Sequence, residues 1–355
     1  MGRPFTPSVL TLPLPKRGIG PGPMILLLLL GLILLLMPGP ARAVPDGGYA
    51  HPEILIQAEE LKALIDAKAP YIRIIDVRHN AKYYLGHIPG AQQLWRNHLE
   101  GKNPGPGLLP TQAQMETILS RLGVGANDTL ILYADQFDHT RLWLILAYYG
   151  FPLKRLKLLD GGLDAWKSKG YPTQITSPRV KRTTCRLPGP SPEPTLVASL
   201  DAVKEAAKDP RKVVVDCRSP REYQGEEFKE GATRPGHIPG AQGIDWKEAD
   251  VASGPLKGYW KPAEEIKKIY GAKGVTADKD IFLYSHNGLP ATHSLVALYL
   301  AGYPLEKLHL YEGSWVEWSR SQEAAELEDR LSGRGKPRKT GKSPMPDSKE
   351  KKTAP

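Results

Sequence analysis

Cysteine is scarce in this chain, since Cys185 and Cys217 are the only two among 355 residues. Two cysteines exclude a disulfide-rich scaffold and a zinc or iron–sulfur site built from several thiolates. A glycine-rich phosphate-binding loop is also missing from the sequence, so we expect no nucleotide cofactor. We expect no other cofactor and no metal, because no spacing among His139, His286 and His293 favours a metal site.

The body of the chain between its two ends has no excess of basic residues, although the formal net charge of the whole chain is +10 at pH 7. Residues 1–43 carry four basic side chains and no acidic one, and residues 331–355 carry eight basic and two acidic ones. These two ends account for the whole excess of positive charge. The near-neutral body between them argues against nucleic acid as a partner.

Long apolar runs are absent apart from residues 24–37, which read MILLLLLGLILLLM. Basic residues precede this run, and the small-residue pattern Ala41-Arg42-Ala43 follows it. This order predicts a signal peptide over residues 1–43 and export, with a bacterial periplasm or cell envelope as the expected location. A spanning helix needs about 20 apolar residues, so a retained N-terminal membrane anchor is the alternative.

The basic tail, residues 331–355, has no aromatic residue and is rich in lysine, proline and serine. Such a composition predicts disorder. We consider two roles for this tail, a solubilising end and weak contact with an anionic membrane surface.

The body of the chain has the composition of a globular protein and repeats itself. The length fits about two domains of roughly 150 residues each. Residues 86–92 and 236–242 both read GHIPGAQ, and IIDVR at 74–78 corresponds to VVDCR at 214–218. Three further matches follow in the same order, which predicts a duplicated domain. An insertion near residues 225–234 explains the longer spacing in the second copy.

Each copy alternates apolar, β-branched runs with helical patterns. This alternation predicts an α/β fold in which each copy is an open, mostly parallel sheet flanked by helices. The expected strands are 72–77, 129–133, 213–217 and 280–284, and the expected helices are 112–122, 141–149, 262–270 and 291–301.

The repeated motifs resemble the tandem-domain rhodanese family, the sulfurtransferases that use thiosulfate or 3-mercaptopyruvate as sulfur donor. The resemblance rests on the D-x-R strand end, the GHIPGA turn and the closing E-G-[SG]…W segment. It implies a non-catalytic rhodanese-like domain at 50–172, a linker at 173–194 and a second domain at 195–320. It also implies that the site lies on the second domain's loop, in the cleft between the domains.

In that family a cysteine opens the site loop, and the loop's backbone N–H groups lower the pKa of its thiol. The cysteine then takes a sulfur atom, becomes a persulfide and passes the sulfur to an acceptor. Ser285 stands at the position of this cysteine, and a serine hydroxyl forms no persulfide. We therefore expect an anion-binding loop without ordinary persulfide catalysis, made of Ser285, His286, Asn287, Gly288, Leu289, Pro290 and Ala291.

Two more departures from the family occur around this loop. The loop carries no lysine or arginine, and Pro290 stands where the family often has an arginine. Glu222 precedes Tyr223, where tandem enzymes tend to carry an arginine. Arg218 and Arg221 remain as residues that could support the site.

Three functions stay open at this stage. The first is a binding module for a small sulfur-containing anion, or for a persulfidated or acidic group of a protein partner. The second is an active thiosulfate or mercaptopyruvate sulfurtransferase, which would need another nucleophile such as Cys217 or Cys185. The third is a serine-dependent hydrolase in which Ser285 pairs with His286 or His293.

Other prominent residues are expected to be structural. His87 and His237 should bond the backbone of their own turns, and Asp76–Arg78 and Asp216–Arg218 should be ion pairs at strand ends. Four tryptophans are expected in the core: Trp143, Trp166, Trp315 and Trp318. Three other aromatic residues are expected along the interdomain cleft: Trp246, Tyr259 and Trp260.

Overall fold

A computed structural model describes residues 47–100, 109–190 and 196–331. The chain divides into the units Met1–Pro45 and Asp46–Pro355, and every described residue belongs to the second. The predicted signal peptide lies outside the described residues, as does the basic tail beyond Leu331. None of the helices in the described ranges is long and apolar enough to span a membrane.

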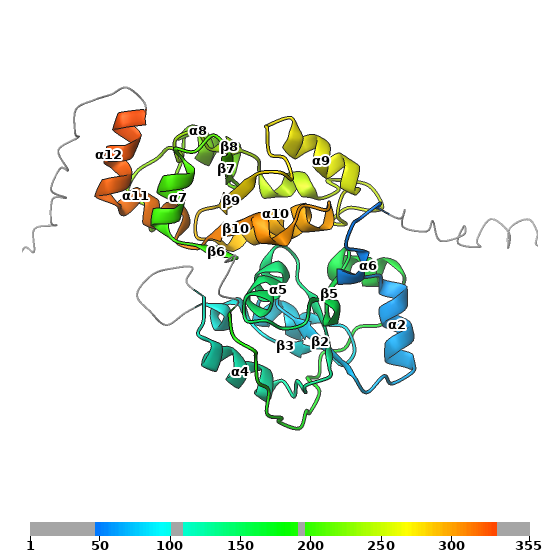
Figure 1. Ribbon diagram of the computed structural model, residues 1–355. Coiled ribbons are helices and arrows are strands. Elements are labelled where there is room, and N and C mark those ends of the chain that lie inside the picture. Colours follow the sequence, from blue (N-terminus) through cyan, green and yellow to red (C-terminus); the bar gives the residue numbers. More distant parts are fainter. Residues whose placement is uncertain (1–46, 101–108, 191–195, 332–355) are drawn as a thin grey trace, which may run out of the picture. The chain divides into compact units, whose positions relative to one another are not determined.

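Two five-stranded sheets form the body of the protein, one in each copy of the repeat (Figure 1). The strand orders are β1-β5-β4-β2-β3 and β6-β10-β9-β7-β8, and every pairing is parallel. The two orders are equivalent, which confirms the duplication and the predicted α/β class. The strands are β1 Leu55–Ile56, β2 Ile72–Asp76, β3 Gln92–Gln93, β4 Thr129–Tyr133, β5 Leu156–Leu159, β6 Val197–Ala198, β7 Lys212–Asp216, β8 Gln242–Gly243, β9 Asp280–Tyr284 and β10 Leu308–Tyr311.

Helices connect the strands in both copies, as parallel pairing requires. In the first copy they are α2 Ala58–Asp66, α3 Asn80–Leu85, α4 Gln112–Arg121, α5 Asp138–Tyr148 and α6 Gly162–Ser168. In the second they are α7 Leu200–Ala206, α8 Pro220–Gln224, α9 Ala263–Gly271, α10 Leu289–Leu300, α11 Ser314–Arg320 and α12 Gln322–Leu331. The short turns are η1 Pro52–Ile54, η2 Arg96–Leu99, η3 Leu153–Arg155, η4 Trp246–Ala249 and η5 Leu305–Lys307.

Helices α5 and α10 begin earlier than their sequence patterns predict, at Asp138 and Leu289. Pro290 lies within the first two positions of α10. The missing N–H of a proline costs nothing there, because the first turn has no intrahelical acceptor for it. The helix therefore starts almost directly after the strand, and the loop between them is short.

A buried ion pair closes the end of the second strand in each sheet. Arg218 donates to both carboxylate oxygens of Asp216, at 2.9 and 2.5 Å, and Tyr284 Oη donates to Asp216 Oδ2 at 2.6 Å. The same oxygen of Tyr284 accepts the N–H of Ile238 in the GHIPG turn at 3.1 Å. The first copy repeats this arrangement, which confirms the structural interpretation of both pairs.

The turn histidines also have the predicted structural role. His87 Nδ1 contacts the carbonyl oxygen of Tyr83 at 2.9 Å, and its ring stacks on that tyrosine. His237 makes the equivalent contacts with Tyr223, at 2.7 Å. Both histidines therefore brace a turn on the preceding helix. The four tryptophans predicted for the core are fully buried: Trp143, Trp166, Trp315 and Trp318.

Contacts between the copies centre on α5 and α10, and one apolar cluster contains residues from both sheets. Thr140 and Thr292 share a hydrogen bond of 2.9 Å between their hydroxyls. Arg141 forms a bidentate ion pair with Glu312, and both side chains are buried. Burial raises the pKa of Glu312 above its usual value, and Arg141 offsets only part of this rise.

Arg141→Met should destabilise the protein because it leaves the Glu312 carboxylate buried without its cation. Loss of one partner of a buried ion pair costs about 3–5 kcal/mol. The double variant Arg141→Met/Glu312→Leu should recover most of the loss, since no charge then stays behind. Urea unfolding midpoints of the two variants measure this, and a double variant no more stable than Arg141→Met would contradict it.

A pH-dependent contribution is expected from Asp160, which is 2% exposed and accepts the backbone N–H of Trp260 at 3.1 Å. Burial raises the pKa of Asp160 to about 6. The folded state therefore binds this proton more tightly than the unfolded state, so ionisation of Asp160 destabilises the protein above about pH 6.

Asp160→Asn should accordingly be more stable than the parent by about 2–3 kcal/mol above pH 6, with the advantage fading toward about pH 4. Urea unfolding of both proteins at several pH values isolates this group, because other titrations cancel in the difference. An advantage that does not change with pH would count against the raised pKa.

Candidate functional site

The candidate loop joins β9 to α10 at the carboxyl end of the central strand of the second sheet. Gly288 caps the helix with a φ of +81°, a conformation that side chains other than glycine rarely adopt. A Cβ there would also lie 3.0 Å from the backbone oxygen of Glu312. Glycine is thus required at this position for two reasons: the turn needs a positive φ, and the backbone that follows β10 lies too close for a side chain.

Ser285 is buried with an exposed fraction of 0%, and hydrogen bonds hold its backbone against the start of α11. Its N–H donates to Ser314 Oγ at 3.2 Å, and its carbonyl oxygen accepts the N–H of Trp315 at 3.0 Å. Its Oγ has no hydrogen-bond partner within the described chain. A buried hydroxyl without a partner is costly, which marks this position as a candidate site.

The amide groups that follow Ser285 form a cradle. Among the hydrogen bonds within the described chain, none uses the backbone N–H of His286, Asn287 or Gly288. These amides lead directly into the 12-residue helix α10. Successive amides at a helix N-terminus form an arrangement that binds anions.

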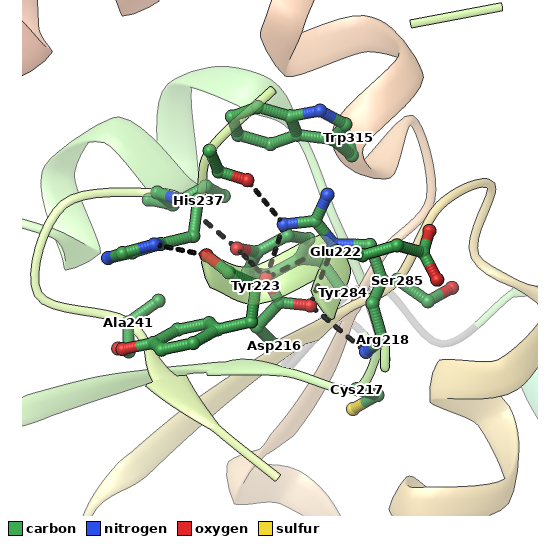
Figure 2. Close-up of polar contacts among 12 residues, drawn as sticks. Asp216, Cys217, Arg218, Glu222, Tyr223, His237, Ala241, Tyr284, Ser285 and Trp315 are labelled. Atoms are coloured by element: carbon green, nitrogen blue, oxygen red, sulfur yellow. Dashed lines mark hydrogen bonds and ion pairs between the residues drawn. The ribbon is translucent and has the colours of Figure 1, made fainter. Parts of the chain in front are cut away.

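Arg218 lies near Ser285, the residue that precedes this cradle (Figure 2). Its Nη2 donates to Asp216 and to the carbonyl oxygen of Gly236, and its guanidinium carbon lies 4.6 Å from the ring centroid of Trp315. Burial alone would lower the pKa of Arg218, but the hydrogen bonds and the charge of Asp216 raise it by more. The net pKa is above the usual value, so the arginine stays charged. Its Nη1 is buried and has no partner in the described chain.

Glu222 is a site residue whose burial the sequence did not reveal. The side chain is 2% exposed; Lys229 Nζ donates to its Oε2 at 2.8 Å, and its Oε1 has no partner among the described residues. Burial would raise the pKa of Glu222, but Lys229 and Arg218 lower it more, so the carboxylate is ionised. Figure 2 shows Glu222, Arg218 and Ser285 together in one cluster.

Arg221 is not brought to this cluster. Its side chain is exposed and lies 3.4 Å from carboxylate oxygens of Glu226 and Glu227. The insertion after α8 contributes other contacts instead: Lys229 reaches Glu222, and the carbonyl oxygen of Glu230 lies 2.9 Å from His286 Nε2. The charged side chains around the loop are thus paired with one another. The positive potential that remains at the loop comes from its backbone N–H groups.

No catalytic serine–histidine pair forms. Ser285 makes no hydrogen bond with either nearby histidine in the described chain. His286 is held by Glu230, and burial lowers its pKa. His293 bonds Asp250 Oδ1 at 2.7 Å through Nε2 and stacks on Trp260. A nucleophile without a base within hydrogen-bond reach lacks the geometry of a serine hydrolase.

Neither cysteine is an activated nucleophile. Both are free and buried, Cys217 with 0% and Cys185 with 5% exposure. Burial raises the pKa of both thiols, and the Glu116 carboxylate raises that of Cys185 further. A reactive cysteine needs a lowered pKa and access to solvent, and these two have neither. Over the residues that the structure describes, no group of three or more histidine, cysteine or acidic side chains could hold a metal ion.

Comparisons with known proteins agree with this architecture. The rhodanese-like domain matches the chain twice, at residues 57–169 and 199–321. The sulfur carrier protein TtuD of Thermus thermophilus is 33% identical over 286 residues, which cover 76% of this chain and 95% of that protein. A putative thiosulfate sulfurtransferase of Synechococcus elongatus is 34% identical over 264 residues, which cover 70% of this chain and 78% of that protein.

Solved structures share the fold. SseA from Escherichia coli, described with the rhodanese fold and catalytic mechanism of 3-mercaptopyruvate sulfotransferases, superimposes with a TM-score of 0.64 at 27% identity. That superposition covers 74% of this chain and 98% of SseA. The two domain matches span more than half of the sequence. The chain therefore belongs to the rhodanese-like domain family, as a tandem member related to the thiosulfate and 3-mercaptopyruvate sulfurtransferases.

Proposed function

We propose that this protein is an exported binding module, in which residues 285–291 bind a small sulfur-containing anion or a persulfidated or acidic group of a protein partner. In this proposal no persulfide forms on the chain itself. The observation that carries it is the loop's composition and geometry: a helix-terminal amide cradle is kept, while a buried serine hydroxyl stands where a thiolate would be needed.

The side-chain charges around the loop cancel one another. Asp216 is paired with Arg218, and Glu222 is paired with Lys229, so the side chains add no net positive charge. Backbone amides and the helix terminus alone then attract the ligand. His286 and Asn287 are partly exposed and form the accessible side of the cradle.

The remaining parts of the proposal rest on the sequence. Residues 1–43 would direct export to the periplasm or cell envelope, with membrane anchoring as the alternative. The basic tail would add weak contact with an anionic membrane surface. Residues 1–43 and 332–355 lie outside the described residues.

The second candidate is an active sulfurtransferase, which the names of the relatives favour. TtuD is named a sulfur carrier protein, and a sulfur carrier, like a sulfurtransferase, needs a group that holds the sulfur atom. This candidate would require a nucleophile other than Ser285. The two buried cysteines, with their raised pKa values, argue against it.

The deciding experiment measures thiosulfate:cyanide sulfur transfer by the full chain and by Ser285→Cys. We expect no turnover by the natural chain and measurable turnover by the variant, because the amide cradle would then activate a thiol. Ala134→Cys is the matched control, since Ala134 follows β4 as Ser285 follows β9, and it should stay inactive. Turnover by the natural chain that alkylation abolishes would overturn the binding role in favour of the second candidate.

Glu222→Gln should strengthen anion binding at the loop, because it removes a buried negative charge beside the cradle. We expect about tenfold tighter binding of thiosulfate, the equivalent of about 1.4 kcal/mol. Isothermal titration of the full chain and the variant measures the change, with exposed Glu226→Gln as control. Unchanged affinity in Glu222→Gln would show that this carboxylate does not face the ligand.

A further inference from the structure

A cleft lies at the carboxyl end of the first sheet, and none of residues 285–291 lines it. It has a volume of about 530 Å³, within the range of small-molecule sites. One wall is the loop after β4, residues 134–136, with His139 at the start of α5 and the Gly161–Gly162 turn. The opposite wall comes from the second copy and includes the predicted cleft residues Trp246 and Trp260. Tyr259, also predicted there, is instead buried against Gly161.

A buried polar atom in this cleft has no partner. His293 lines the cleft, is 3% exposed, and its Nδ1 makes no hydrogen bond within the described chain. Its Nε2 is bound to Asp250 Oδ1 at 2.7 Å, which assigns the ring proton to Nε2. In the tautomer whose proton lies on Nε2, Nδ1 accepts a hydrogen bond. A buried acceptor without a donor is costly, so its presence in a cleft points to a ligand that donates.

The histidine is held rigidly in that orientation. Its ring stacks on Trp260 at a centroid distance of 4.1 Å and meets the edge of Trp246 at 5.2 Å. The ring centroid of His139 lies 6.4 Å from that of His293. Burial lowers the pKa of His139 to about 3, so this neighbour stays neutral and adds no charge.

Charged side chains of both signs stand at the rim. Lys247 and Lys257 line the cleft, and in the described structure neither forms a salt bridge. Asp164 is exposed and forms no ion pair among the described residues, whereas Asp135 pairs with Lys82. The rim therefore offers cations to a carboxylate and an acid to an ammonium group.

We propose that this cleft binds a small α-amino or α-hydroxy acid with an apolar side chain. The carboxylate would pair with Lys247 and Lys257, the α-substituent would donate to His293 Nδ1, and the side chain would pack on Trp246 and Trp260. The site is separate from residues 285–291, so this proposal stands or falls independently of the function proposed for that loop.

Tryptophan fluorescence of the full chain, titrated with L-phenylalanine and L-phenyllactate, tests the proposal. Both probes should give a saturable change. Removing either recognised group should weaken binding at least about tenfold: 3-phenylpropionate lacks the α-donor, and L-phenylalanine methyl ester lacks the carboxylate. No saturable change up to about 50 mM, or equal binding of 3-phenylpropionate, would overturn it.

Variants separate the roles of the residues. Lys247→Gln/Lys257→Gln alters only exposed side chains and should weaken binding of both acids by about fivefold or more. His293→Phe keeps an aromatic ring against Trp260 and should remove the preference for L-phenylalanine over 3-phenylpropionate. Lys273→Gln, exposed and outside the cleft, is the matched control. Undiminished binding by the double lysine variant would exclude this cleft as the site.

Discussion

The buried Asp216–Arg218 pair is the interaction on which the second copy depends. Its carboxylate receives the guanidinium and the Tyr284 hydroxyl, and the same hydroxyl receives an amide of the GHIPG turn. One ion pair thus joins three segments that are distant in sequence: the end of β7, the turn before β8 and the end of β9. Because breaking it would leave a charge without a partner in a dry environment, the geometry where the site loop begins is firmly held.

This frame holds the loop without help from the Ser285 side chain. Tyr284 is anchored through its hydroxyl, Gly288 makes the turn into α10, and the backbone of Ser285 is bonded to Ser314 and Trp315. None of these contacts uses the Ser285 side chain. A substitution of this side chain would therefore alter the chemistry of the loop while the cradle of amides stays in place.

The two copies keep one frame and differ in what surrounds their loops. The frame, with its ion pair, tyrosine and turn histidine, is repeated almost atom for atom. The second copy adds the insertion that brings Lys229 and Glu230 to its loop. In the first copy the corresponding loop borders a cleft whose other wall belongs to the second copy. Duplication has thus provided two loop positions with different neighbours.

Much of the fold was predictable because its determinants are local. The period of the apolar residues located the main strands, and the repeated motifs established the duplication and the parallel α/β class. Helix starts were less accurate: α5 and α10 begin two or three residues early, since short loops and a tolerated Pro290 extend their first turns. The assignment of Ser285 to the position of the family's cysteine stays a prediction from the sequence.

The sequence by itself determined the duplicated α/β architecture, because the repeated motifs and the apolar patterns that specify it are local to the chain. Only the tertiary structure decided which charges meet that loop. Glu222 is buried there, while its neighbour Arg221 turns to Glu226 and Glu227 in solvent. Adjacent residues on a short helix face different directions, so spacing could not distinguish them. The pairing of His293 with Asp250 and two tryptophans likewise arises only when distant segments pack.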